Sequence, residues 1–218
     1  MGSNIRYRQD HLEIIINFGI KLICSCFAID ILSETMRWMG ETRLYVAALY
    51  FILKGASYAG KLSFVPVKPQ QNGVDIEAGS KSFTLPPITE PFDDEDVQII
   101  EDDFKLVWIV QTSHSTGSVK SGPNVELDDG VFTIFVIRSG SRCEMLSLLL
   151  MMDDGNHINH SRVEVYKVTK FRLEPKTTKG IYSLDGEVVE YGPIQGVIKP
   201  SHAKVSSTFR SYKINSLL

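Results

Sequence analysis

Short apolar runs bounded by glycine, proline, serine or aspartate recur along most of this chain. Such runs predict strands, because β-branched and aromatic side chains suit a pleated surface and turn residues end it. The predicted strands are 61–67, 104–110, 131–138, 163–168, 170–173, 180–184, 187–190 and 194–198. Turn signals roughly every 8–12 residues are typical of a β-sandwich. The predicted fold class is therefore mainly β with helices (α+β), as a β-sandwich domain.

Two segments show helical spacing instead. Apolar residues recur at helical positions from Leu44 to Leu53, and Gly40 separates them from a shorter stretch before it. We therefore expect a short helix, a break and a longer helix within residues 31–54, as an amino-terminal helical segment. Residues 144–152 are apolar nearly all round, which predicts a well-buried helix.

Residues 90–103 hold eight acidic side chains and no basic one. This composition predicts a solvated loop. A calcium site is the alternative, and the segment lacks the ligand spacing and turn glycine of an EF-hand.

Composition excludes several classes of function. The chain has 23 Lys and Arg against 26 Asp and Glu, so no global basic field favours nucleic acid. Three cysteines without a C-x-x-C pair favour reduced thiols in a cytoplasmic protein and argue against structural zinc. Residues 12–29 are apolar but are interrupted by Glu13, Asn17 and Lys21, so they are a poor candidate for a membrane span.

Three stretches, taken in order, resemble the sphingosine kinases. No single piece is decisive, but the ordered set is specific, and it extends from about residue 27 to about residue 205. We therefore expect a divergent lead at 1–26, a carboxy-terminal lipid-binding β-sandwich domain at 27–205 and a tail at 206–218. The matching segments are 30–34, 37–43 and 58–66, then 129–131, 138–140 and 151–157, and finally 171–175, 184–187 and 194–196.

The resemblance implies a lipid kinase that moves the γ-phosphoryl group of ATP to the primary hydroxyl of sphingosine or a related long-chain base, with Mg²⁺. In that family an amino-terminal α/β domain carries a glycine-rich phosphate loop and the general base. The G-G-D-G phosphate loop and the S-G-D-G stretch of that domain are both absent from this sequence, so an amino-terminal kinase domain is an expected missing partner. No residue of this chain is nominated as catalytic, and activity of the chain alone is not expected.

The resemblance also implies nucleotide contacts. Arg37 and Arg43 match arginines that contact phosphate, Asp185 matches an acid in the magnesium environment, and Glu187 matches one near adenine. Guanidinium groups suit phosphate oxygens because they bind in a two-pronged manner. The alternatives are two surface arginines and a simple hairpin turn at Asp185-Gly186.

For the lipid, Asp30 matches an aspartate that binds the polar head, and Glu34 lies one helical turn further on. Asp30 could instead be a helix N-cap, and residues 145–152 could be ordinary core. Peripheral association with a membrane surface is also expected. The positions that match the lining of the family's tail slot are Leu44, Ala48, Met145, Leu148, Leu149, Met152 and His157.

Two hypotheses stay open from the sequence. In the first, the chain is part of a sphingosine kinase. In the second, it is a catalytically inactive lipid-binding or interaction module that lacks the kinase domain. A weaker third hypothesis is an interaction domain that uses the acidic segment 90–103.

Overall fold

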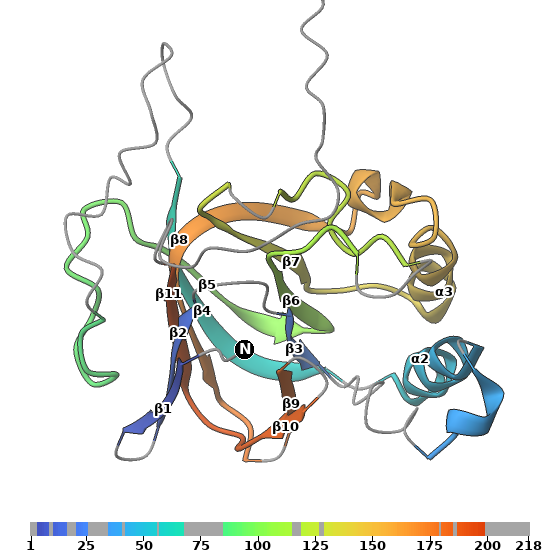
Figure 1. Cartoon of the computed structure of the whole chain (residues 1–218), viewed down its shortest axis with the longest axis horizontal. Helices are drawn as coiled ribbons and strands as arrows, with labels where there is room; N and C mark the ends of the chain where they lie inside the picture. Colours follow the sequence, from blue (N-terminus) through green and yellow to red (C-terminus); the bar gives the residue numbers. More distant parts are fainter. Residues whose placement is uncertain are drawn as a thin grey trace, which may run out of the picture.

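The computed structural model describes residues 4–8, 11–16, 21–25, 35–40, 42–55, 57–67, 85–114, 119–126, 129–178, 180–184 and 187–198. Within these residues, eleven strands join in one mostly antiparallel sheet. The sheet folds over into two layers that enclose a common core (Figure 1). The predicted β-sandwich with helices is confirmed.

The first layer is built around β4 and the carboxy-terminal half of β8, which pair from Gly60 opposite Pro175 to Val65 opposite Lys170. β5 pairs with the other edge of β4, and β11, β2 and β1 continue the layer beyond β8. The strands are β1 (Asn4–Arg8), β2 (His11–Ile16), β4 (Tyr58–Pro66), β5 (Gln98–Phe104), β8 (Glu164–Pro175) and β11 (Ile194–Ile198).

The second layer starts at the amino-terminal half of β8 and continues through β7, β6, β3, β9 and β10. Its other strands are β3 (Lys21–Ser25), β6 (Leu106–Val110), β7 (Phe132–Ile137), β9 (Ile181–Leu184) and β10 (Glu187–Val189).

β8 belongs to both layers and curves from one to the other (Figure 1). The sequence predicted two separate strands here, 163–168 and 170–173, and this was wrong. Pairing with β7 ends at Val168 and pairing with β11 begins at Lys170. Thr169 therefore marks the change of layer without interrupting the strand.

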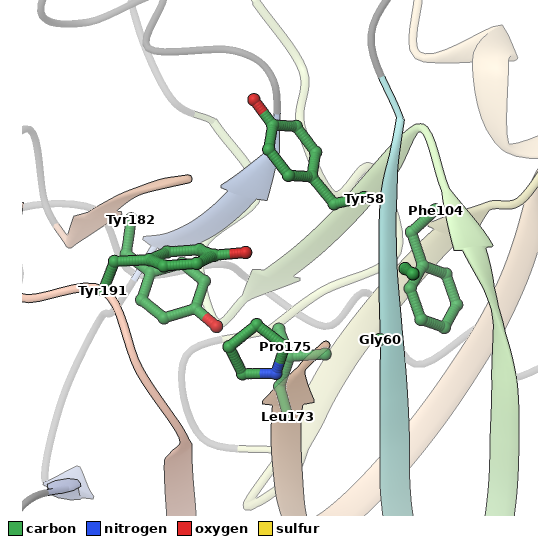
Figure 2. A pocket seen from close by; sticks show the side chains of 8 residues that line it. Tyr58, Gly60, Phe104, Leu173, Pro175, Tyr182 and Tyr191 are labelled. Carbon is green, nitrogen blue, oxygen red and sulfur yellow. The ribbon is translucent and has the colours of Figure 1, made fainter. Parts of the chain in front are cut away.

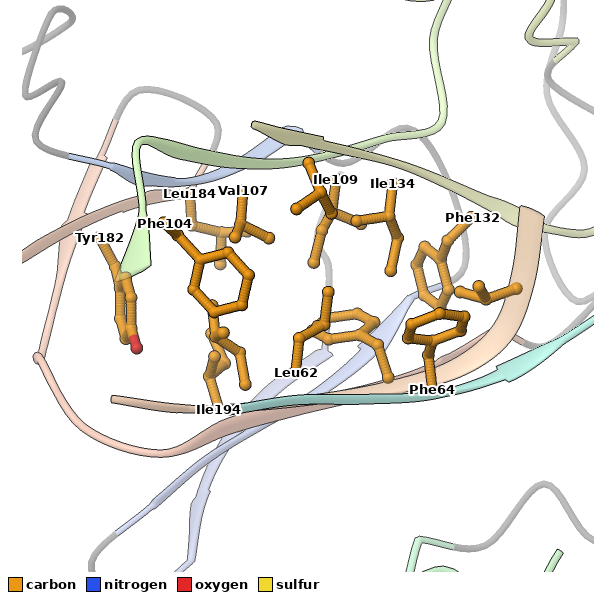
Figure 3. Packing of buried hydrophobic residues seen from close by; sticks show 14 of the residues in the cluster. Leu62, Phe64, Phe104, Val107, Ile109, Phe132, Ile134, Tyr182, Leu184 and Ile194 are labelled. Atoms are coloured by element: carbon orange, nitrogen blue, oxygen red, sulfur yellow. The ribbon is translucent and has the colours of Figure 1, made fainter. Parts of the chain in front are cut away.

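The core lies between the layers, where apolar side chains from β6 and β7 meet those from β4, β8 and β11 (Figure 3). Gly196 on β11 lies opposite Phe171 on β8. A Cβ atom at position 196 would come within 2.4 Å of the Phe171 ring. The glycine is required because the aromatic ring occupies the space where a side chain would be.

The helices lie together at one end of the sandwich (Figure 1). The predicted break at Gly40 is confirmed, because this glycine has a φ of 63° and separates a 3-10 turn from a longer helix. The helical elements are η1 (Arg37–Met39), α2 (Thr42–Lys54), α3 (Arg142–Leu150) and η2 (Asn156–Asn159).

The expectation of a well-buried helix at 144–152 was wrong. In α3 only Met145 and Leu148 are buried, whereas Leu146 is 39% and Leu150 66% exposed. A helix can turn only one stripe of its surface toward a sheet, so apolar residues on the other faces remain exposed.

The expectation of a solvated loop throughout 90–103 was also wrong in its second half. Residues 98–103 form most of β5, whose acidic side chains Glu101, Asp102 and Asp103 are exposed. Lys176 pairs with Glu101, and Arg138 lies 3.6 Å from Asp102. Charges on a strand of this kind discourage pairing with other chains.

Residues 85–97 cover the outer face of the first layer, where the buried guanidinium of Arg172 holds them. Its Nη1 donates to the carbonyls of Ile88 and Glu90 at 3.1 and 2.6 Å. Its Nη2 donates to Pro86 and Pro87 at 3.5 and 3.2 Å. Arg172 therefore fixes the segment to β8 through hydrogen bonds to four of its carbonyls.

Three further contacts support this attachment. Arg172 Nε donates to Gln195 Oε1 at 3.0 Å, and the guanidinium lies 4.6 Å from the centre of the Phe92 ring. Lys170, one pleat away on β8, forms a 3.0 Å ion pair with Asp94.

Sequence reasoning assigned no strand to residues 1–26, but β1, β2 and β3 lie there and pair with the sheet. β2 runs parallel to β11, and β3 lies between β6 and β9. The boundary expected at residue 26 stays a prediction.

Candidate functional site

The outer face of β6 and β7 is the floor of the candidate site. Val107 and Ile109 of β6 point into the core, so Leu106, Trp108 and Val110 point to the opposite face. Every residue of β7 is buried. A strand that is buried on both faces must have another element packed on its outer face, and here the helices pack there.

α2 and α3 pack over the first part of this floor. The buried apolar side chains that meet there form what we call the helix cluster. Partly buried residues pack around it, namely Phe51, Tyr58, Leu106, Leu149 and Val163. Ala48 of α2 is also buried. The members of the helix cluster are Ile52, Ile137, Met145 and Leu148.

A second group, which we call the ring cluster, lies on the next part of the floor. Leu106 and Val163 border both clusters, so the two are continuous. Met152 and Ile158 also pack against the ring cluster. Its members are Trp108, Val110, Val125 and Phe135.

His157 is buried beside the ring cluster, with its ring centroid 5.7 Å from that of Phe135. Its Nε2 donates to the carbonyl oxygen of Ser121 at 3.3 Å. Burial lowers the pKa of His157, because desolvation disfavours the charged imidazolium. The structure thus places an imidazole at the edge of an apolar layer, where burial favours its neutral form.

Local interactions fix the elements that carry these side chains. Ser141 and Glu144 form a capping box at the start of α3, in which the Ser141 Oγ accepts from the Glu144 amide at 3.2 Å. The Tyr45 hydroxyl of α2 donates to Asp153, after α3. Lys105 Nζ donates to the carbonyl of Gly55 at 2.9 Å, at the end of α2.

The structure gathers most of the predicted tail contacts on one face. Met145 and Leu148 belong to the helix cluster and Leu149 borders it, while Met152 borders the ring cluster. Ala48 and His157 are buried at the same end of the sandwich. The side chain of Leu44 lies outside what the structure describes.

The polar part of the predicted site is described only in part. Arg37 is exposed in η1, and Arg43 is half-buried in the first turn of α2. β9 and β10 pair as a hairpin with Leu184 opposite Glu187, as the Asp185-Gly186 turn signal predicts. Asp30, Glu34, Asp185 and the side chain of Glu187 lie outside the described residues.

Sequence reasoning missed Trp108 and Phe135 as components of this face. Both were assigned to strands, but the strand pattern alone does not say which face meets the helices. A usable signal was present, because the continuous apolar runs of β6 and β7 indicate strands buried on both sides.

A small aromatic cavity lies at the end of the sandwich where β4 begins and β8 ends (Figure 2). The rings of Tyr182 and Tyr191 lie 4.9 Å apart, and the Tyr191 and Thr177 hydroxyls are 2.6 Å apart. None of the residues that line this cavity is among the predicted site residues. They are Tyr58, Ala59, Gly60, Phe104, Leu173, Pro175, Tyr182 and Tyr191.

No helix in the described part of the chain has the length and apolar character to cross a bilayer. No group of three or more His, Cys, Asp or Glu side chains in the described ranges is arranged to hold a metal ion.

Comparison with known proteins agrees with this architecture. Residues 94–207 match the model of the YegS C-terminal NAD kinase beta sandwich-like domain, and the chain belongs to this family. A solved structure from Bacillus anthracis, provisionally described as a diacylglycerol kinase, has the same fold with a TM-score of 0.50 at 13% identity. That similarity covers 84% of this chain and 57% of the bacterial one.

Curated relatives point to a particular group of lipid kinases. The chain is 30% identical to human sphingosine kinase 1 over 80% of its own length and 47% of the relative. It is 32% identical to human sphingosine kinase 2 over 67% of its length and 24% of the relative. The expected resemblance to the carboxy-terminal portion of sphingosine kinases is confirmed, and the chain spans half or less of the length of these relatives.

Proposed function

We propose that this chain is the lipid-binding part of an ATP-dependent sphingosine kinase and that it supplies part of the nucleotide site. The observation that carries the proposal is the gathering of Met145, Leu148, Leu149, Met152 and His157 over one face of the second layer. An apolar layer between helices and a sheet suits an alkyl tail, because each buried methylene is worth about 0.8 kcal/mol.

The head of the long-chain base carries an amine and hydroxyl groups. In this proposal the carboxylate of Asp30 binds them, and Glu34, four residues later in the sequence, assists. A carboxylate at this position favours a cationic base over a neutral diacylglycerol, because an unpaired buried charge would penalise the neutral lipid.

The nucleotide would be bound by residues from two separate parts of the sequence. Arg37 and Arg43 would bind phosphate oxygens, and the positive φ of Gly40, 63°, lets the chain turn sharply between them. Asp185 would hold Mg²⁺ together with the phosphates, because Mg²⁺ needs only one or two protein carboxylates. Glu187 would lie at the adenine end. An amino-terminal kinase domain would supply the phosphate loop and the general base.

Membrane association follows from the exposed side of α2. Val46, Leu49, Tyr50 and Leu53 are 40–59% exposed and occupy positions i, i+3, i+4 and i+7 of α2, so they form one apolar stripe. Leu150 of α3 is exposed as well. An apolar stripe of this kind suits transient contact with the bilayer from which a long-chain base is taken.

The alternative is an inactive module that binds the lipid without phosphorylating it. The two functions share the lipid site and differ in turnover. Both predict that the 218-residue chain alone binds sphingosine without turnover of labelled ATP. They are separated by adding the amino-terminal kinase domain of a relative: turnover supports the proposed function, and binding without turnover supports the inactive module. Turnover by the chain alone would contradict the need for an amino-terminal domain.

The head-group assignment is tested by titrating sphingosine into the wild-type chain and two variants. Asp30→Asn should weaken binding about tenfold, the equivalent of one charge-assisted hydrogen bond. Asp93→Asn, an exposed acid in the segment over the first layer, is the matched control and should bind like wild type. Unchanged affinity of Asp30→Asn would remove Asp30 from the head-group role, and failure of the wild type to bind sphingosine would refute the proposed function.

A further inference from the structure

β10 is a short strand at the edge of the second layer. Within the described residues it pairs only with β9, over three positions from Glu187 opposite Leu184 to Val189 opposite Tyr182. β9 itself is fixed, because β3 pairs with its other edge and the Tyr182 side chain is fully buried in the core. A ladder of three residues contributes little stability by itself. Contacts beyond the ladder are therefore needed to hold β10 in one place.

Tyr191, two residues beyond the end of β10, supplies such contacts. Its ring centroid lies 4.9 Å from that of Tyr182 on β9 (Figure 2). Its hydroxyl lies 2.6 Å from the Thr177 hydroxyl, in the segment that follows β8. The ring also occupies the space beside Gly180, where an added Cβ atom would come within 2.2 Å of it. Tyr191 thus joins the exit of β10 to β9 and to the segment between β8 and β9.

The Tyr191 ring also rests on the main core. It is partly buried against the core cluster that contains Val189 of β10. It lines the aromatic cavity together with Leu173 and Pro175 at the end of β8. Leu173 pairs with β4 on one side and with β11 on the other. Because a side chain packed against a strand held on both edges has little freedom to move, Tyr191 gives β10 a fixed end.

We propose that Tyr191 is a positioning residue for the nucleotide, because it fixes the end of β10 and through that strand the place of Glu187. The inference rests on the proposed function, in which Glu187 lies at the adenine end. Glu187 begins β10 and Tyr191 follows its end, so movement of that end moves Glu187. The described lipid contacts of that function lie on or next to α2, α3 and η2. Loss of Tyr191 should therefore weaken nucleotide binding and leave lipid binding unchanged.

Amide hydrogen exchange of the 218-residue chain tests the structural step. Tyr191→Ala removes the ring, and exchange at residues 187–189 should rise about tenfold relative to exchange in β7. Tyr166→Ala is the matched control, because Tyr166 is also partly buried against the main core and its hydroxyl donates to Glu164 at 2.6 Å. The control should not raise exchange in β10 relative to β7. Equal exchange at residues 187–189 in the two variants would overturn the inference.

Kinetics test the nucleotide step, with the amino-terminal kinase domain of a relative added to the chain. Tyr191→Ala should raise the KM for ATP about tenfold, the equivalent of one charge-assisted hydrogen bond. The KM for sphingosine and kcat should change by less than about twofold, and Tyr166→Ala should leave the KM for ATP unchanged. A general loss of structure would affect both substrates. An equal rise in both KM values, or an unchanged KM for ATP in a folded Tyr191→Ala variant, would therefore contradict the proposed role.

Two further variants separate the ring from the hydroxyl. Tyr191→Phe loses only the bond to Thr177, so its KM for ATP should stay within about threefold of wild type. Gly180→Ala keeps Tyr191 but puts a methyl group where the ring lies, so it should raise the KM for ATP as Tyr191→Ala does. A wild-type KM for ATP in Gly180→Ala would refute positioning by the ring, even where Tyr191→Ala does not fold.

A double-mutant cycle tests whether Tyr191 acts through Glu187. Glu187→Gln and Tyr191→Ala together should raise the KM for ATP no more than the larger of the two single changes, because both remove the same contact. Fully additive effects would show that Tyr191 acts by another route and would remove its role for Glu187.

The two proposals fail differently. Absence of turnover with the added kinase domain supports the inactive module, and the role of Tyr191 then falls with the proposed function. Turnover with an unchanged KM for ATP in Tyr191→Ala retains the proposed function and loses only the role of Tyr191.

Discussion

The attachment of residues 85–97 by Arg172 gives the strongest test of how this fold is held together. Arg172→Ala removes five hydrogen-bond contacts and the guanidinium above Phe92. The change leaves the carbonyls of Ile88 and Glu90 without their donor. Because Arg172 is only 4% exposed, solvent does not replace these bonds while the segment stays in place.

The magnitude follows from the type of bond. A hydrogen bond to a charged group contributes about 1.5–3 kcal/mol, and contributions that share one side chain do not add. Opening of the segment to water returns part of the loss. We therefore expect Arg172→Ala to lower the free energy of unfolding by about 3 kcal/mol. With a slope of about 2 kcal/mol per molar urea, the midpoint should fall by about 1.5 M.

Urea unfolding and amide hydrogen exchange together test this reasoning. Exchange should rise first in 85–97, and the core strands β6 and β7 should follow only as global stability falls. Arg172→Lys should recover part of the loss, because an ammonium cannot reproduce the guanidinium fork. Lys167→Ala, on the same strand but with a half-exposed side chain, is the control and should change stability by less than about 0.5 kcal/mol. A loss below about 1 kcal/mol in Arg172→Ala would refute the argument.

Three further predictions follow from single contacts. Gly196→Ala should cost about 1–3 kcal/mol in urea unfolding, because its Cβ meets the buried Phe171 ring at 2.4 Å. Gly192→Ala, with no atom within 4 Å of its Cβ, should be nearly neutral, and equal effects of the two changes would contradict this packing. Ser141→Ala should cost about 1 kcal/mol by loss of the capping box, and no change in the urea midpoint would count against that cap. Burial holds the pKa of His157 below its ordinary value, so the unfolded chain binds the proton first and stability should fall as pH drops below about 6.5. His157→Gln should flatten this fall in urea midpoints measured across pH, and an unchanged slope would argue against it.

Much of the fold could be predicted from local patterns. The strand at 194–198, the helix after Gly40 and the hairpin around Asp185-Gly186 all follow from side-chain periodicity and turn residues. The failures have physical reasons as well. The acidic residues of β5 are tolerated in a strand because their side chains remain in water and pair with Lys176 and Arg138.

Some residues of the candidate site could be predicted from the sequence and others could not. The resemblance gave Met145, Leu148 and Met152 as tail contacts, and the structure gathers them. It gave no reason to expect Trp108 beside them, because only the tertiary structure decides which face of β6 the helices cover. The polar contacts of Asp30 and Asp185 stay predictions.

The sequence alone determined that this chain is a β-sandwich that also carries helices, because strand periodicity and turn chemistry are local properties of the chain. It also carried the family resemblance in short ordered motifs. Tertiary structure decided which side chains meet. It made β8 one strand shared by two layers, and it left part of an apolar helix exposed. It also set Trp108 beside His157, 49 residues later in the sequence. Such pairings depend on long-range strand register and on which face is covered, and no window of sequence contains that information.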